Sequence, residues 1–353
     1  MHPLLERLGL TSPIVQAPMA GTSTPELAAA VSNAGALGSI AIGHIDGETA
    51  AADIARLRSA TNRAFNVNLF CHAPAARDLD VENAWLGRLA PIFQTYGARP
   101  PAALNEIYTS FLSDPAPLEL LLRTRPAVVS LHFGLPPTET ITALKRAGST
   151  VFATATSVAE GEAAARAGVD AVVAQGFEAG GHRGIFDPNG PDEQLGVFAL
   201  THRLAVALDI PVIAAGGVMD GAGIAAARAL GAIAVQMGTA FIACPEARPD
   251  PAHLAALLAS RTSRTLMTRA ISGRPARCLA NRFTDLEASL GTPPAYPVAY
   301  DSGKALNAAA KSGGEGGYGA WWAGQCAQLI RPMPAARLVG LLSEELRAAA
   351  AHV

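Results

Sequence analysis

One histidine stands in a segment whose composition suits proton transfer. The sequence QGFEAGGHRGIF places His182 seven residues after Gln175 and directly after Gly180 and Gly181. Paired glycines let a loop fold back over a ligand, and an imidazole titrates near neutral pH, so it can take or give a proton. Glu178 lies close enough in the sequence to orient the imidazole. A lone histidine is also a common structural or surface residue, and both interpretations stay open.

Two further segments carry the features of an anion site. The sequence AAGGVMDG contains Gly216 and Gly217, and the sequence QMGTAF contains Gly238 and Thr239. Glycine lets backbone N–H groups come close to an anion, and Thr239 adds a hydroxyl donor. Neither segment contains lysine or arginine, so neutral donors would hold a phosphate there. The same glycines could simply make tight turns between elements.

Eight short apolar runs recur along the chain and set the positions of these segments. Each has four to six residues without clean alternation of polar and apolar types. That pattern is typical of strands buried on both faces of a parallel sheet. The runs are Ile14–Ala17, Leu37–Ile42, Phe65–Phe70, Val128–Phe133, Val151–Thr154, Ala171–Gln175, Val212–Ala215 and Ile233–Met237.

Helical patterns lie between most of these runs. Thr24 is a suitable N-cap for the first helix, and glycines follow several of the helices, as at C-caps. The expected helices are Pro25–Ala34, Gly47–Ala60, Pro137–Ala147, Val158–Ala167, Glu193–Leu208 and Gly221–Leu230. This alternation predicts an α/β fold, a TIM (β/α)8 barrel, rather than an open Rossmann-like sheet. The literal GxGxxG at Gly314–Gly319 follows no strand, so it indicates a flexible hinge rather than a dinucleotide site.

Polar residues and glycines occupy the positions where the predicted strands end. In TIM barrels the chemistry lies at the C-terminal ends of the strands. The residues there are Ala17, Pro18, Met19, Asn68, His132, Thr154, Gln175, Gly216, Gly217, Gln236, Met237, Gly238 and Thr239. An apolar barrel interior does not need these side chains, whereas a planar polar ligand does.

Two long segments interrupt the alternation and are predicted to form a lid over the C-terminal mouth of the barrel. The predicted barrel comprises residues 1–72 and 124–272 with a C-terminal helix in 320–353, and the lid or substrate-binding insertions are residues 73–123 and 273–319. Helical patterns cover Leu118–Arg123, Ala252–Arg261 and Pro334–Ala351. Residues Arg274–Gly319 are rich in glycine and proline, so we expect them to be irregular.

Composition excludes several classes of function. The 27 Lys and Arg residues against 29 Asp and Glu give a net charge of -2, so the chain lacks the basic character of nucleic-acid or anionic-membrane binders. Its four cysteines are widely spaced without a CxxC pair, which argues against structural zinc and disulfides and favours a reduced, cytoplasmic protein. The N-terminal sequence has no apolar signal-peptide region, and the uncharged run Ala229–Pro245 is shorter than a spanning helix.

Six motifs together resemble the nitronate monooxygenases, formerly called 2-nitropropane dioxygenases, of the bacterial class I type. They are PIVQAPMAG (13–21), TPELAAAVSNAG (24–35), NLF (68–70), QGFEAGGHRG (175–184), PVIAAGGVMDG (211–221) and QMGTAFIACPE (236–246). The resemblance covers nearly the whole chain. It implies a TIM barrel that binds FMN non-covalently and needs no metal.

The resemblance also implies roles for individual residues. Those matching the family's FMN site are Asn68, Gln175, Gly180, Gly181, Gly216, Gly217, Gln236, Met237, Gly238 and Thr239, with the backbone of Ala17, Pro18 and Met19 under the flavin ring. His182 matches the active-site histidine. The segment YPVAYDSGK resembles a motif that lies over the flavin and brings Tyr296, Tyr300 and Lys304 into the pocket, while Tyr108 and His132 match further substrate-pocket positions.

The tyrosines and Lys304 have suitable chemistry for those positions. Only five tyrosines occur in the chain, and Tyr108, Tyr296 and Tyr300 are among those in the two insertions. Their phenol groups can hydrogen-bond nitro or nitronate oxygens while the rings cover a flavin. Lys304 could neutralise a substrate carboxylate, although a solvated surface charge is the default for a lysine.

The implied reaction is the oxidation of an alkyl nitronate by O2 to a carbonyl compound and nitrite. Propionate 3-nitronate is the implied substrate, with 3-oxopropanoate as the product and detoxification as the role. The alternative is an NAD(P)H-dependent FMN reductase of the same superfamily, acting on a quinone or an enoyl thioester. A flavin-binding protein without turnover is a third possibility. We expect a monomer or weak homodimer without nucleic-acid or membrane partners.

Overall fold

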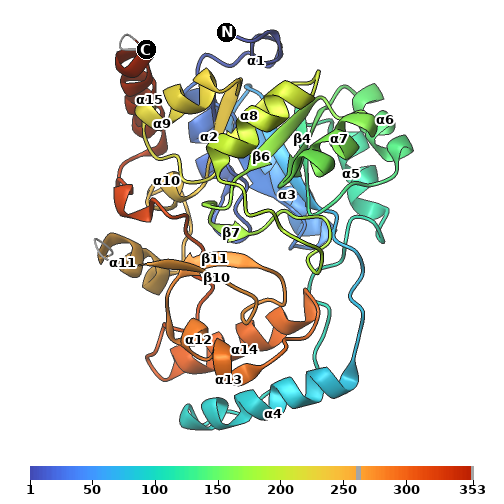
Figure 1. The fold of residues 1–353 in the computed structure, drawn as a ribbon, viewed down its shortest axis with the longest axis vertical. Coiled ribbons are helices and arrows are strands. Elements are labelled where there is room, and N and C mark those ends of the chain that lie inside the picture. Colours follow the sequence, from blue (N-terminus) through green and yellow to red (C-terminus); the bar gives the residue numbers. More distant parts are fainter. Residues whose placement is uncertain (260–263, 351–353) are drawn as a thin grey trace.

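A barrel of eight parallel strands lies in the upper part of the molecule in the view of Figure 1. The computed structural model describes residues 1–259 and 264–350. The strands are β1 (Ile14–Gln16), β2 (Gly38–Ala41), β3 (Phe65–Phe70), β4 (Val128–His132), β5 (Thr150–Ala155), β6 (Ala171–Gln175), β8 (Val212–Ala215) and β9 (Ala234–Met237). They follow one another in the order β1-β9-β8-β6-β5-β4-β3-β2, and a bridge between Val15 and Leu37 brings the two edges together. The eight predicted strands and the TIM barrel are thus confirmed.

Helices surround the barrel as the periodicity predicts. They are α2 (Pro25–Asn33), α3 (Gly47–Ala60), α5 (Ala116–Thr124), α6 (Thr138–Arg146), α7 (Val158–Arg166), α8 (Val197–Ala207), α9 (Gly221–Ala229) and α15 (Ala335–Ala350). Thr24 caps α2 by accepting a hydrogen bond from the N–H of Leu27. The helix predicted at Glu193–Leu208 begins later than expected, at Val197, because Glu193–Gly196 continue the preceding loop. The predicted helix ends at Arg261 and Ala351 lie outside the described residues.

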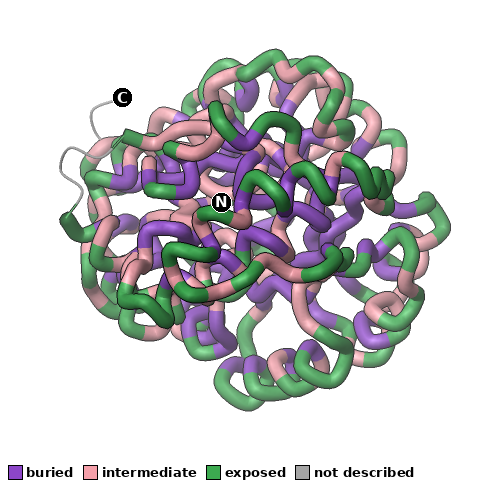
Figure 2. Tube along the Cα trace, turned by 90° about the horizontal axis from the view of Figure 1, so that it is seen from below, coloured by how far each residue is buried: buried purple, intermediate pink, exposed green. Residues whose placement is uncertain are grey.

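Apolar side chains fill the space between the strands and the helices. All residues of β3, β5 and β6 are buried, which agrees with their unbroken apolar runs. The C-terminal helix α15 packs Leu338 and Leu342 into the same cluster as Ile224 of α9 and Leu27 of α2. Figure 2 shows buried chain in the interior and exposed chain along the outer helices. Within the described ranges, the structure contains no helix both long and apolar enough to cross a membrane.

A small antiparallel sheet and several helices lie beside the C-terminal mouth of the barrel (Figure 1). The sheet has the order β10 (Thr265–Thr268), β11 (Ala276–Leu279), β7 (Gly181–His182). The helices are α4 (Leu79–Thr95), α12 (Arg282–Asp285), α13 (Glu287–Leu290) and α14 (Val298–Ser312). The remaining elements are α1 (Pro3–Arg7), α10 (Thr239–Ile242), α11 (Pro251–Ala259) and the 3-10 turn Ala327–Leu329. Trp85 of α4 and Leu306 of α14 share one apolar cluster.

The expectation that Arg274–Gly319 is irregular was wrong. The segment contains β11 and three helices, and α14 alone has 15 residues. Proline and glycine flank α14, and Gly303 lies inside it, so the local composition hides the helix. Gly303 is required there because a Cβ atom would lie 2.6 Å from the carbonyl oxygen of Ile271. Tertiary packing against α4 and the β10–β11 turn therefore determines this helix more than local propensity does.

Candidate functional site

A cavity of about 380 Å³ opens at the C-terminal ends of the barrel strands and extends under the small sheet and α14. Its volume lies within the range of small-molecule and cofactor pockets. All the residues that the sequence analysis assigned to the cofactor, the substrate or catalysis line this cavity: Ala17, Pro18, Met19, Asn68, Tyr108, His132, Gln175, Gly180, Gly181, His182, Gly216, Gly217, Gln236, Met237, Gly238, Thr239, Tyr296, Tyr300 and Lys304. The structure thus brings the predicted cofactor residues and the predicted substrate residues to one place.

The floor of the cavity offers neutral polar groups and close backbone approach. Gly216 and Gly217 have φ angles of 124° and 68°, a region of backbone conformation that favours glycine. Asn68 uses its amide NH2 to donate to Oγ and O of Ser130, at 2.9 and 3.1 Å. This holds the carboxamide at the strand end. Glycine backbone, amides and a hydroxyl in one floor fit the phosphate and polar ring edge of a flavin mononucleotide.

The loop between β6 and α8 folds back over the cavity as its glycines predict. A Cβ atom on Gly180 would lie 2.5 Å from the backbone of Ala323 and Gly324, so only glycine allows this approach. His182 lies in β7, where it pairs with Ala276 of β11. Gln175 donates its side-chain N–H to the carbonyl oxygen of His182 at 3.0 Å and accepts the N–H of Gly184 at 2.7 Å. Both ends of this amide therefore hold the histidine loop.

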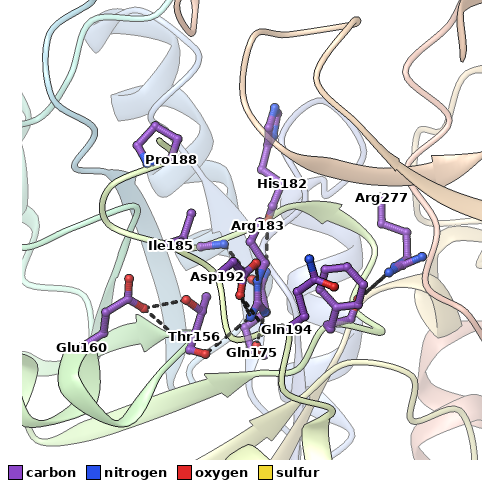
Figure 3. Close-up of polar contacts among 12 residues, drawn as sticks. Thr156, Glu160, Gln175, His182, Arg183, Ile185, Pro188, Asp192, Gln194 and Arg277 are labelled. Carbon is purple, nitrogen blue, oxygen red and sulfur yellow. Dashed lines mark hydrogen bonds and ion pairs between the residues drawn. The ribbon is translucent and has the colours of Figure 1, made fainter. Parts of the chain in front are cut away.

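A buried arginine fixes the other side of the same loop (Figure 3). Arg183, 2% exposed, forms two hydrogen bonds to the carboxylate of Asp192, at 2.8 and 2.9 Å. It also donates to the carbonyl oxygen of Gln175 at 2.5 Å. In Figure 3 the side chain of His182 points away from this network. Arg183 therefore anchors the loop and leaves the imidazole free to face the cavity.

Glu178 does not orient His182. Its carboxylate instead accepts the N–H of Val197 at 2.8 Å, at the beginning of α8. The partner of the imidazole is Ser272, whose Oγ lies 2.9 Å from Nε2 of His182. Ser272 is in the turn between β10 and β11. The sequence gives no signal for this contact because the two residues are 90 positions apart.

Aromatic rings and positive charge surround His182. The ring centroids of Trp322, Tyr296 and Phe133 lie 5.1, 5.2 and 5.7 Å from its own. Burial, followed by the positive charge of Arg274, holds the pKa of His182 well below its usual value. The imidazole is therefore neutral at neutral pH, the state that a general base requires.

His132 is the other histidine at a strand end, and its ring already has hydrogen-bond partners within the protein. Nδ1 lies 3.0 Å from Oγ1 of Thr154, and the ring also reaches the backbone of His182. Burial and the charge of Arg274 lower the pKa of His132 to about 3. His132 therefore supports the histidine loop and is less suited than His182 to take a proton from a ligand.

Lys304 and two tyrosines form the rim of the cavity on the side of α14. The ammonium nitrogen of Lys304 lies 4.7 Å from the ring centre of Tyr108 and 5.4 Å from that of Tyr300. Partial desolvation lowers the pKa of Lys304, while the charge of Asp301 opposes the shift. Lys145 and Lys311 have carboxylate partners, whereas Lys304 has none within the parts of the chain that the structure describes. Its charge is thus available to an anionic ligand.

Several residues of the site were not found from the sequence. Trp322 lines the cavity beside His182. The guanidinium of Arg274 lies 4.2 Å from the ring centre of Phe133. Two adjacent tryptophans after a glycine-rich segment were a usable signal for Trp322. Arg274 offered none, because nothing in its sequence neighbourhood distinguishes it from the other arginines. Among residues 1–259 and 264–350, no three His, Cys, Asp or Glu side chains are grouped to hold a metal ion.

Comparison with known proteins agrees with this geometry. The family model described as nitronate monooxygenase matches residues 2–345. The chain is 58% identical to a nitronate monooxygenase of Paraburkholderia phytofirmans, covering 98% of this chain and 94% of that protein. It is 52% identical to a nitronate monooxygenase of Pseudomonas aeruginosa, covering 96% of this chain and 97% of that protein.

Solved structures show the same relationship. A nitroalkane oxidase from Streptomyces ansochromogenes superposes with a TM-score of 0.90 at 40% identity, covering 99% of both chains. FabK from Thermotoga maritima superposes with a TM-score of 0.76 at 28% identity, covering 100% of this chain and 98% of that one. Together with the motifs and the cavity, these matches establish that the chain belongs to the nitronate monooxygenase family.

Proposed function

We propose that the protein binds FMN and oxidises alkyl nitronates with O2 to a carbonyl compound and nitrite. The observation that carries this proposal is the convergence of the glycine floor, His182, the rim tyrosines and Lys304 on one cavity. Propionate 3-nitronate is the proposed substrate because it combines a nitronate with a carboxylate. We further propose a cytoplasmic detoxifying enzyme that works as a monomer or weak homodimer, with small molecules as its partners.

In this proposal the floor of the cavity holds the cofactor. The backbone at Gly216, Gly217 and Gly238 and the Thr239 side chain would hold the phosphate, and Ala17–Met19 would lie under the flavin ring. FMN supplies the electron acceptor for the nitronate, and the protein supplies binding, orientation and electrostatics.

The residues above the floor would bind and orient the substrate. The tyrosines would donate hydrogen bonds to the nitronate oxygens, while their rings and that of Trp322 exclude water. Lys304 would hold the carboxylate. His182 would take the α-proton when the substrate arrives as a neutral nitroalkane, whereas a preformed nitronate needs no base.

An NAD(P)H-dependent FMN reductase is the second candidate. FabK superposes over nearly the full length of both chains, so the overall fold does not by itself decide between the two candidates. An enoyl reductase domain from Bacillus amyloliquefaciens also shares the fold, but its 10% identity shows no more than that. The two functions differ in what reduces the flavin, a nitronate or a nicotinamide.

The cofactor is the first expectation to test. The purified protein should be yellow and should release one FMN per chain on heating, because the glycines of the cavity floor let backbone N–H groups approach a phosphate and the sequence has no adenosine-binding fingerprint. Chromatography of the released cofactor against FMN and FAD standards measures this. FAD, or the absence of any flavin, would contradict the proposed role of the floor.

Lys304→Met should weaken the apparent affinity for propionate 3-nitronate and leave that for ethylnitronate nearly unchanged. A charge-assisted contact contributes about 1.5–3 kcal/mol, which corresponds to roughly one to two decades in affinity. Steady-state kinetics on both substrates measure the difference. Lys145→Met is the matched control, since Lys145 pairs with Asp170 on the outer surface. Equal losses on both substrates would instead place Lys304 at the nitronate group or the lid.

A further inference from the structure

The partner of His182 decides which of its two ring nitrogens can act as a base. Ser272 lies in the turn between β10 and β11, with its Oγ 2.9 Å from Nε2 of His182. His182 itself pairs with Ala276 of β11, and the N–H of Arg183 donates to the carbonyl oxygen of Pro275 at 2.8 Å. The backbone therefore holds both members of this contact in place.

The Ser272 hydroxyl has a single proton and two possible acceptors. Oγ lies 3.2 Å from the carbonyl oxygen of Arg274, and the N–H of Arg274 lies 3.5 Å from Oγ. Both residues are buried, and within the described ranges no other donor reaches that carbonyl oxygen. A proton turned toward His182 would leave the buried carbonyl unpaired, which is unfavourable. The hydroxyl therefore donates to Arg274 and accepts from Nε2–H of His182.

We propose that Ser272 is a positioning residue that keeps the proton of His182 on Nε2 and so makes Nδ1 the basic nitrogen. A neutral imidazole has one donor and one acceptor nitrogen, so fixing the first determines the second. Nδ1 has no hydrogen-bond partner among the described residues, and the imidazole lines the cavity. The inference rests on the proposed function.

The proton transfer that follows from this arrangement is simple. Nδ1 takes the α-proton of a neutral nitroalkane, the C–H bond breaks, and its electron pair enters the C=N bond of the nitronate. The imidazole becomes an imidazolium, with protons on both nitrogens.

The groups around His182 keep its imidazole neutral, so the position of its single proton decides whether the ring can act as a base. The charged and titratable groups that face it are Arg274 from the β10–β11 turn, His132 from the end of β4, His72 from the segment after β3, and Tyr296 and Tyr300 from the lid side. Burial and the positive charge of Arg274 lower the pKa of His182, so the neutral ring predominates at neutral pH. A neutral ring with its proton on the wrong nitrogen cannot accept one from the substrate.

Nitrogen-15 NMR of the histidine-labelled holoenzyme tests the tautomer directly. His182→Asn identifies the signals, because they disappear in that variant. In the wild type Nε2 should be protonated and Nδ1 should not, and in Ser272→Ala the two tautomers should mix. A wild-type proton on Nδ1, or an unchanged tautomer in Ser272→Ala, would overturn the proposal.

Kinetics provide a second test. Ser272→Ala should lower kcat for a neutral nitroalkane by about tenfold or more, since a placed base contributes about 10²–10⁴-fold. KM and turnover of the preformed nitronate should change little, and Ser272→Thr, which keeps the hydroxyl, should restore kcat. Equal losses on nitroalkane and nitronate would show a purely structural role and overturn the proposal. If the wild type oxidised neither substrate, the proposed function would fail, while the NMR result would still decide the tautomer.

Discussion

Replacing His182 by asparagine should lower the oxidation rate of a neutral nitroalkane by about 10²–10⁴-fold, the contribution of a positioned base. Oxidation of the corresponding preformed nitronate should stay within about tenfold of the wild type, because a nitronate has already lost its α-proton. The neutral imidazole follows from burial and from the charge of Arg274, which lower its pKa. Oxygen consumption with nitroethane and with ethylnitronate measures the two rates.

His132→Asn is the control for this experiment. His132 also lines the cavity, but its Nδ1 is engaged by Thr154. The control should therefore affect both substrates to a similar degree. A selective loss on nitroethane in His132→Asn, with none in His182→Asn, would exchange the two roles. An enzyme that is inactive on nitroethane in the wild type would act only on preformed nitronates.

Replacing Arg183 by methionine should lower the free energy of unfolding by about 3 kcal/mol, the lower end of the cost of removing one partner from a buried ion pair. The lower end applies because the side chain of Asp192 is 20% exposed whereas that of Arg183 is 2% exposed. The carbonyl oxygen of Gln175 would also lose its donor. Urea unfolding followed by circular dichroism measures the change.

Arg203→Met provides the matched control. Arg203 and Glu193 form an ion pair at 2.8 Å in which both side chains are 47% exposed. Exposed pairs contribute roughly 0–1 kcal/mol, so this variant should unfold almost as the wild type does. Similar losses in the two variants would mean that the Arg183 contacts do not anchor the loop.

The barrel and the cavity floor could be predicted from the sequence because their signals are local. Each strand is a short apolar run, and the topology alone places the residues at its C-terminal end, or directly after it, at the mouth. This is why Asn68, Gln175 and Gly217, which are far apart in the chain, were all expected at one cavity. The glycines needed for positive φ or close approach also carry a local signal.

The surroundings of the histidine could not be predicted in the same way. Ser272 and Arg274 meet His182 only because β7 pairs with β11, and a two-residue strand gives no periodic pattern. Glu178 was a reasonable partner by proximity in the sequence, but the backbone turns its carboxylate to Val197. Helix α14 was hidden by its proline and glycine neighbours. Long-range pairing therefore determines the features that local composition missed.

The central claim is that a nitronate, and not a nicotinamide, reduces the flavin in this cavity. The direct measurement is the visible absorbance of the flavin after anaerobic mixing of the purified protein with propionate 3-nitronate or with NADH. The account predicts that the nitronate bleaches the flavin and that NADH leaves its spectrum unchanged. Bleaching by NADH without bleaching by the nitronate would contradict it and establish the reductase.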